Sequence, residues 1–92
     1  MAEASNPLKL PETLDTAAAP ALLEALRERR GAALVLDASA LRWIGAACAQ
    51  LLLAAVKAWR VDRRTLSIVD LGEEPKALLA LMGVEPASLR AD

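Results

Sequence analysis

The sequence contains no histidine, no phenylalanine and no tyrosine, and its single cysteine is Cys48. Without histidine and with one thiol, zinc sites and histidine-based catalytic triads are excluded. One cysteine also excludes an intramolecular disulfide, which fits a reducing compartment. Neither GxGxxG nor GxxxxGK(S/T) occurs, so no phosphate-binding loop is indicated. We therefore expect a protein that is not an enzyme and holds no metal or cofactor.

Long apolar runs and a strong charge of either sign are missing as well. The longest apolar run, from Ala46 to Val56, is interrupted by Gln50 and is far shorter than the roughly 20 residues of a membrane span. The net charge of −1 gives no general attraction to nucleic acid or to anionic membranes. With no signal peptide recognised, we expect a cytoplasmic protein that neither enters the membrane nor binds nucleic acid.

The 92 residues, 55% apolar and 25% charged, indicate one small globular domain. We expect a flexible N-terminus at 1–6 and a single domain at 7–92. Apolar spacing and turn residues predict strands at 8–10, 32–36 and 65–69, and helices from about 16 to 30, 45 to 60 and 75 to 82, with one more turn at 84–89.

The alternation of strands and helices predicts an α/β fold with a small, mostly parallel sheet and right-handed crossovers. The run at 32–36 is continuously apolar, as expected of a strand covered on both faces. The segment before the first helix has room for only one short strand. The predicted buried stripe of the central helix consists of Ile44, Cys48, Leu51, Leu52, Ala55 and Trp59.

Two features near this helix have two interpretations each. Cys48 near the helix start is either a redox thiol or a small buried residue, and the spacing favours the second. The cluster of Arg60, Arg63 and Arg64 either binds phosphate or forms a solvated turn after the helix, and we favour the turn.

The most informative stretch joins an apolar strand to the central helix through Asp37, Ser39 and Gly45. Such a junction places a loop and a helix N-terminus at one edge of a sheet, where partners and anions meet α/β proteins. Asp37 and Asp70, both at strand ends, either bind Mg²⁺ or cap turns, and we favour capping because the further acidic residues and lysine of a magnesium site are not found. Ser39 is either a substitute phosphoacceptor or a turn-closing residue, and again we favour the turn. Trp43 either anchors an interface or covers the core.

The chain resembles the STAS domain family, named after sulfate transporters and anti-sigma factor antagonists. The resemblance is carried by Leu14–Ala18, Leu34–Ser39, Ile44–Cys48 and Leu81–Val84, and it runs from about Leu8 to Val84. It implies a small α/β fold and a non-catalytic module that docks on a partner, often a histidine-kinase-like anti-sigma factor.

In the switching members of that family, a kinase phosphorylates a hydroxyl at the start of the central helix. By spacing from Asp37, that motif falls on Gly45–Cys48 and the acceptor position is Ala47, which has no hydroxyl. The family's phosphate switch therefore does not transfer to this site. We expect the partner to bind the surface formed by Asp37, Ser39, Trp43, Gly45, Ala46, Ala47 and Gln50.

The leading interpretation is a bacterial signalling adaptor that binds a histidine-kinase-like regulator or a chemotaxis kinase. The alternative is an accessory subunit bound to the ATPase of a phospholipid-transporting ABC system. Nucleotide binding, a third class, is disfavoured because no basic or glycine-rich phosphate site is present.

Overall fold

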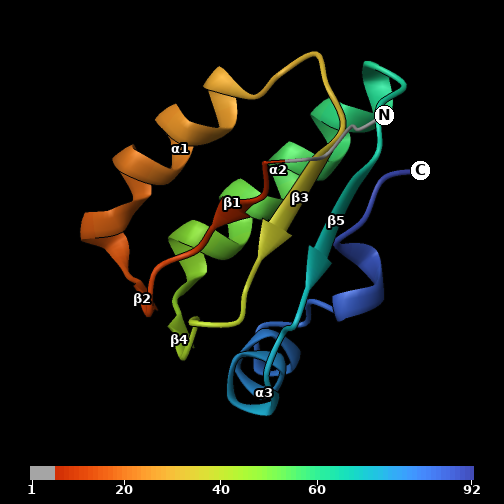
Figure 1. Ribbon diagram of the computed structural model, residues 1–92. Coiled ribbons are helices and arrows are strands. Elements are labelled where there is room, and N and C mark those ends of the chain that lie inside the picture. Colours follow the sequence, from red (N-terminus) through yellow and green to blue (C-terminus); the bar gives the residue numbers. More distant parts are fainter. Residues whose placement is uncertain (1–5) are drawn as a thin grey trace.

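Strands and helices alternate along the chain in the computed structural model, which describes residues 6–92 (Figure 1). The elements are β1 (Leu8–Lys9), β2 (Thr13–Leu14), η1 (Thr16–Ala18), α1 (Ala19–Glu28), β3 (Leu34–Asp37), β4 (Trp43–Ile44), α2 (Ala46–Val61), β5 (Leu66–Val69), α3 (Glu73–Leu81) and η2 (Pro86–Ser88). The predicted α/β fold with a mostly parallel sheet is confirmed.

The main sheet has the strand order β1-β3-β5, and all of its pairings are parallel. Leu36 of the central strand lies opposite Leu8 on one side and Ile68 on the other. The outer edge of β5 is bridged in antiparallel fashion at Leu66 by Ala91 near the end of the chain. The two-residue strand β1 leaves only a short edge on the other side, which limits edge-to-edge pairing.

A second, smaller sheet was not expected from the sequence. Strand β2 pairs in parallel with β4, with Leu14 opposite Ile44. The expectation of one strand before the first helix was therefore wrong, since β1 and β2 both precede it. Each of these strands has only two residues, too few to show an alternating pattern in the sequence.

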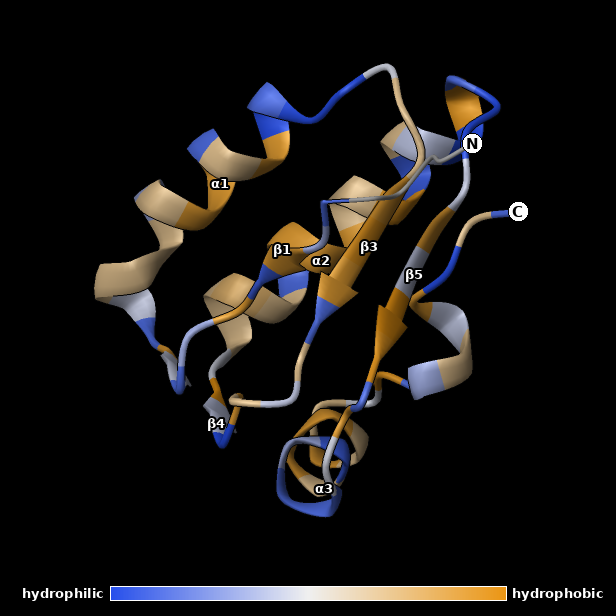
Figure 2. Cartoon of the chain, in the orientation of Figure 1, coloured by the Kyte–Doolittle hydropathy of each residue, from blue (hydrophilic) through white to orange (hydrophobic). Residues whose placement is uncertain are grey.

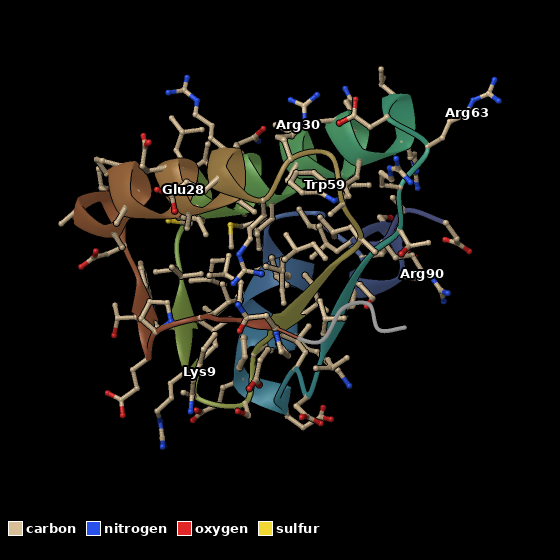
Figure 3. The ribbon with its side chains drawn as sticks, turned by 45° about the horizontal axis from the view of Figure 1, so that its top comes forward. Lys9, Glu28, Arg30, Trp59, Arg63 and Arg90 are labelled. Carbon is tan, nitrogen blue, oxygen red and sulfur yellow. The ribbon has the colours of Figure 1, made fainter. Side chains whose placement is uncertain are left out.

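Within residues 6–92, only one face of the main sheet carries a helical layer. Leu34 and Leu36 are buried under α1 and α2, which lie on the same side of the sheet (Figures 1 and 3). On the opposite face Val35 and Ser67 are half-buried, and Val69 retains 39% of its exposure. The expectation that β3 is covered on both faces was therefore wrong. Figure 2 shows the apolar strands bordered by hydrophilic helix ends.

The predicted stripe of α2 is confirmed, with Leu51 alone only partly buried. Trp59 is the largest fully buried side chain of the described residues. Ala32 and Ala33, expected in a covered strand, are exposed because they lie in the connection between α1 and β3. Within residues 6–92, no helix has the length and apolar composition that a membrane crossing requires.

The helix starts follow from local chemistry. The Oδ1 atom of Asp15 accepts a hydrogen bond of 3.0 Å from the backbone N–H of Ala18, so the chain enters α1 through the short turn η1. Pro20 lies in the first turn of α1, where its missing N–H costs no helical bond. Of the expected flexible segment 1–6, residues 1–5 lie outside the described residues, and the carbonyl of Asn6 accepts a hydrogen bond of 2.6 Å from Arg29 Nη1.

Candidate functional site

Asp37 and Ser39 form a turn at the end of β3. Asp37 Oδ1 accepts a hydrogen bond of 2.9 Å from the backbone N–H of Ser39. This backbone donor, together with the Ser39 side chain, holds the pKa of Asp37 below its usual value, and Lys9 contributes in the same direction. The predicted turn at Asp37 and Ser39 is therefore present in the structure.

Asp70 follows β5, the neighbour of β3, so it lies beyond the same end of the sheet as Asp37. Its backbone adopts a left-handed conformation with φ of 60°, and its side chain is exposed. In the described part of the chain, no group of three or more acidic, histidine or cysteine side chains converges as a metal site.

Trp43 of β4 presents its indole ring at the surface, with 46% of the residue exposed. A Cβ atom built on Gly45 would lie 2.9 Å from Cη2 and 3.0 Å from Cζ3 of this ring. The ring therefore lies directly over the backbone of Gly45, an approach that only glycine permits without a shift of the indole. Of the two interpretations of Trp43, the structure favours an exposed ring over a cover for the core.

Strand β2 holds this junction in place. The carbonyl of Glu12 accepts hydrogen bonds from the backbone N–H groups of Arg42 (2.8 Å) and Trp43 (3.2 Å). The carbonyl of Leu14 accepts one of 3.0 Å from the N–H of Gly45. Glu12 and Leu14 were not identified as supporting residues from the sequence. They act through their backbone carbonyls, which every residue type has, so the sequence contains no pattern that marks them.

The first turn of α2 places small residues at the surface. Ala46 and Ala47 are exposed, and Gly45 caps the helix without a side-chain hydrogen bond. Cys48, the third residue of the helix, points inward and is fully buried, with Sγ 3.4 Å from the carbonyl of Asp15. Burial, and then the nearby Asp15 carboxylate, raise the pKa of the Cys48 thiol. A reactive cysteine needs a lowered pKa and access, so the buried-residue interpretation is confirmed.

Trp43, Gly45, Ala46 and Ala47 are near neighbours along the chain that are exposed or half-buried, and we call them the junction surface. Gln50 is exposed one turn further along α2 and lines a shallow groove between α2 and η2 with Leu53, Lys57 and Ser88 among others. Asp37 and Ser39 lie at the start of the loop that leads to the junction, engaged with one another rather than with the tryptophan.

The junction surface has a charged rim on the side of α3. Arg42 Nε lies 4.0 Å from Glu74 Oε1, and both side chains are about seven-tenths exposed. An exposed pair of this kind contributes little to stability. The junction surface itself consists of an indole ring, a glycine and two alanines, without a charged side chain.

The chain is similar to a known protein family. A family model described as "Mlab, STAS domain" matches residues 1–90, a range that includes every strand and helix of the fold. None of the curated proteins and none of the solved structures compared with the chain matches it significantly.

Proposed function

This chain belongs to the STAS domain family, and we propose that it is a non-catalytic docking module whose partner binds the junction surface without a phosphate switch. The observation that carries the proposal is the exposed methyl group of Ala47, at the position where switching members carry the phosphorylated hydroxyl. A methyl group accepts no phosphate, so the surface keeps one charge state.

The chemistry of the junction surface supports a protein partner. Ala46 and Ala47 hold no polar side-chain atoms that a partner would have to desolvate. The exposed ring of Trp43 is of the residue type most enriched among the energetically dominant contacts of interfaces. The Trp43 ring packs against the backbone of Gly45, and such a contact favours low ordering cost on binding.

For the partner, we propose a histidine-kinase-like regulator or a chemotaxis kinase, with the chain acting as a bacterial signalling adaptor in the cytoplasm. This setting rests on the resemblance to anti-sigma factor antagonists. In it, the partner's own state and the concentration of the chain control binding.

A second candidate is an accessory subunit on the ATPase of a phospholipid-transporting ABC system. The family model itself favours it, because its description names Mlab rather than an anti-sigma factor antagonist. Affinity purification from cells that express the chain discriminates the two settings. A kinase-like regulator supports the first setting, and an ABC ATPase that co-purifies in fixed proportion supports the second.

The junction surface is tested by Ala47→Asp. The helix dipole tolerates a carboxylate at the start of α2, so we expect native-like circular dichroism. We expect the affinity for the purified partner to fall at least tenfold, about 1.4 kcal/mol, because the contact must now desolvate a charge. Ala87→Asp, an equal change on exposed η2, is the control and should leave the affinity unchanged. An unaltered affinity for Ala47→Asp, measured by calorimetry, would contradict the proposal and move the interface elsewhere, first to the short β1 edge of the sheet.

A further inference from the structure

A groove runs between α1 and α2 on the helical face of the molecule, away from the open face of the sheet. Leu23 and Arg27 contribute from α1, and Leu51, Ala54 and Ala58 contribute from α2. Leu23, Leu51 and Ala58 are only partly buried, and Ala54 is exposed, so apolar surface is accessible along the groove. Figure 3 shows the two helices side by side, with Arg30 and Trp59 where they meet.

The size and shape of the groove indicate which kind of occupant it takes. Its volume of about 190 Å³ is below the roughly 300–1,000 Å³ of pockets that enclose small molecules. The α1–α2 groove is open along its length. Ala54 lines this groove and also the groove between α2 and η2, so this alanine forms a low ridge between the two. A low ridge flanked by grooves is the surface on which another helix packs closely.

One end of this groove is basic, because Arg27 and Arg30 line it. The last turns of α1 and α2 and the turns that follow them carry Arg27, Arg29, Arg30, Arg60, Arg63 and Arg64. The carboxylates on the same segments are Glu28 and Asp62, and Asp62 already binds Arg30 through bonds of 2.8 and 3.1 Å. Arg27 is therefore the cation that the groove offers to a ligand, and it lies beside the apolar lining.

Helix direction adds a second electrostatic preference. Both α1 and α2 run from the β2–β4 end of the molecule toward the basic end, so their C-termini lie together there (Figure 1). The negative ends of two helix dipoles therefore lie at the end of the groove that Arg27 and Arg30 line. An added helix is favoured when its N-terminus lies at this end, antiparallel to both, and when its first turn carries Asp or Glu.

We propose that the α1–α2 groove docks an amphipathic helix of the protein partner, with an apolar face on Leu51 and Ala54 and an acidic first turn at Arg27. The inference rests on the proposed function, because it assigns a second contact to the same kind of partner. It adds the partner's secondary structure, its charge pattern and its direction. The groove begins on the same helix, α2, whose first turn forms the junction surface.

The first experiment replaces Ala54 by p-benzoylphenylalanine in cells that express the chain, followed by ultraviolet irradiation and mass spectrometry of the cross-linked peptide. We expect adducts with an amphipathic segment of another protein that has Asp or Glu in its first turn. The same probe at Ala47 reports on the junction surface. A probe at Ser67, half-buried on the open sheet face, is the control and should not reach this segment.

The second experiment measures binding of a synthetic peptide with the cross-linked sequence. We expect Arg27→Glu to weaken binding at least tenfold, and replacement of the peptide's acidic residue by arginine to restore it. Lys9→Glu, an equal charge change on exposed β1, is the control and should alter the affinity less than twofold.

The outcomes separate this inference from the proposed function. An adduct at Ala54 with a second copy of this chain, with lipid or with a basic segment overturns the groove proposal. So does the absence of any adduct at Ala54, or a peptide affinity that Arg27→Glu leaves unchanged. Adducts at Ala47 without adducts at Ala54 reject the groove and leave the junction surface standing, whereas no adduct at Ala47 counts against the proposed function.

Discussion

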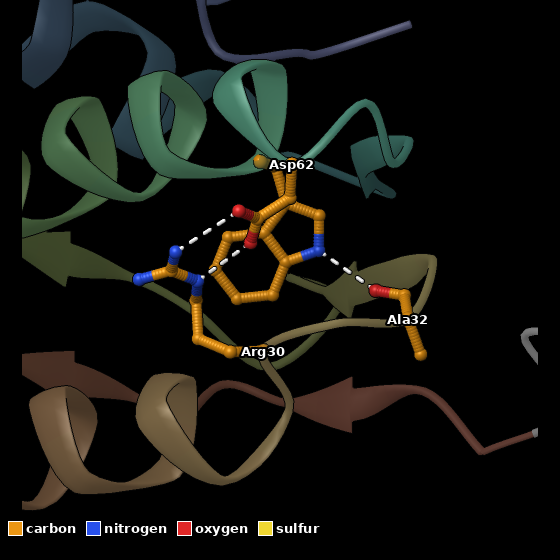
Figure 4. A network of polar contacts seen from close by, with 4 residues as sticks. Arg30, Ala32 and Asp62 are labelled. Atoms are coloured by element: carbon orange, nitrogen blue, oxygen red, sulfur yellow. Dashed lines mark hydrogen bonds and ion pairs between the residues drawn. The ribbon is translucent and has the colours of Figure 1, made fainter.

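Polar contacts among four residues connect the ends of α1 and α2 with the segment that leads into β3 (Figure 4). The four residues are Arg30, Ala32, Trp59 and Asp62. The indole N–H of buried Trp59 donates a hydrogen bond of 2.9 Å to the carbonyl of Ala32. The guanidinium of Arg30 lies 6.0 Å from the centre of the same ring and binds both carboxylate oxygens of Asp62. Because the fork of arginine matches a carboxylate, this pair holds a defined geometry at the rim of the core. It also closes the basic end of the α1–α2 groove.

The Arg30–Asp62 pair predicts a dependence of stability on acid. The hydrogen bond from Arg30 lowers the pKa of the Asp62 carboxyl in the folded state. Because the pKa of Asp62 is lower in the folded than in the unfolded protein, its ionised carboxylate stabilises the fold at pH values above the unfolded-state pKa of about 3.9. This contribution is lost as the pH falls through the folded-state pKa. Urea unfolding of wild type, Asp62→Asn, Arg30→Gln and the double variant should show coupling between the two residues at pH 7. The coupling should weaken as the pH falls through the folded-state pKa of Asp62, and a coupling that does not change with pH would contradict the assignment.

Substitution of Leu52 tests whether the predicted stripe of α2 belongs to the hydrophobic core. Leu52 lies in the middle of α2 and is 3% exposed. Leu52→Ala should lower the free energy of unfolding by about 2–5 kcal/mol, because it removes buried methyl groups and leaves a cavity. Leu81→Ala is the matched control, since Leu81 is 85% exposed, and should cost no more than about 0.5 kcal/mol. Equal unfolding midpoints for the two variants would show that the stripe of α2 is not core.

At the scale of elements, α2 and α3 end in the same backbone motif with different residues. After α3, Val84 N–H binds the carbonyl of Leu79 at 2.8 Å, and Gly83 between them has a φ of 78°. After α2, Arg64 N–H binds the carbonyl of Trp59 at 2.9 Å, and Arg63 has a φ of 57°. Both turns need one residue in the left-handed backbone conformation, which glycine adopts freely and arginine does not.

This pair of turns predicts opposite effects for opposite substitutions. Gly83→Ala should lower the free energy of unfolding by about 1 kcal/mol, because alanine carries the steric cost of the left-handed region. Arg63→Gly should raise it by about 0.5 kcal/mol, since the relief of that cost exceeds the added freedom of the unfolded chain. Thermal unfolding of both variants gives the signs, and a stabilising Gly83→Ala would refute the capping argument.

Element boundaries were predictable where a local residue determines them. Asp15 at the start of the first helix, Pro75 in the first turn of α3 and Gly83 at its end each act through their own backbone or side chain. The strands β2 and β4 were not predictable, because each has two residues and exists only through its partner.

At the scale of the whole molecule, the two ends have different chemistry. The junction surface lies where β4 leads into α2, and the arginine-rich segments lie at the far ends of α1 and α2 (Figure 1). A partner that contacts both would lie along the full length of α2. The open face of the sheet, with Val35 half-buried and Val69 39% exposed, lies on the other side.

The surface chemistry predicts that docking is constitutive. Incubation with a serine kinase and ATP should leave residues 37–50 without phosphate, because position 47 is an alanine. Mass spectrometry provides the measurement, and Ala47→Ser, which restores a hydroxyl there, is the control for a competent kinase. Partner affinity should be equal before and after the incubation. Stoichiometric phosphate on Ser39 would restore the switch and contradict this expectation.

The sequence by itself determined the features that depend on neighbours along the chain. The turn at Asp37, the buried stripe of α2 and the absence of a hydroxyl at Ala47 all follow from residue type and spacing. Only the tertiary structure decided that the ring of Trp43 lies exposed over Gly45, because this depends on the pairing of β4 with the distant β2. It also decided which side chains of α1 and α2 line the groove between them. Packing between segments far apart in sequence sets these features, and no local pattern encodes it.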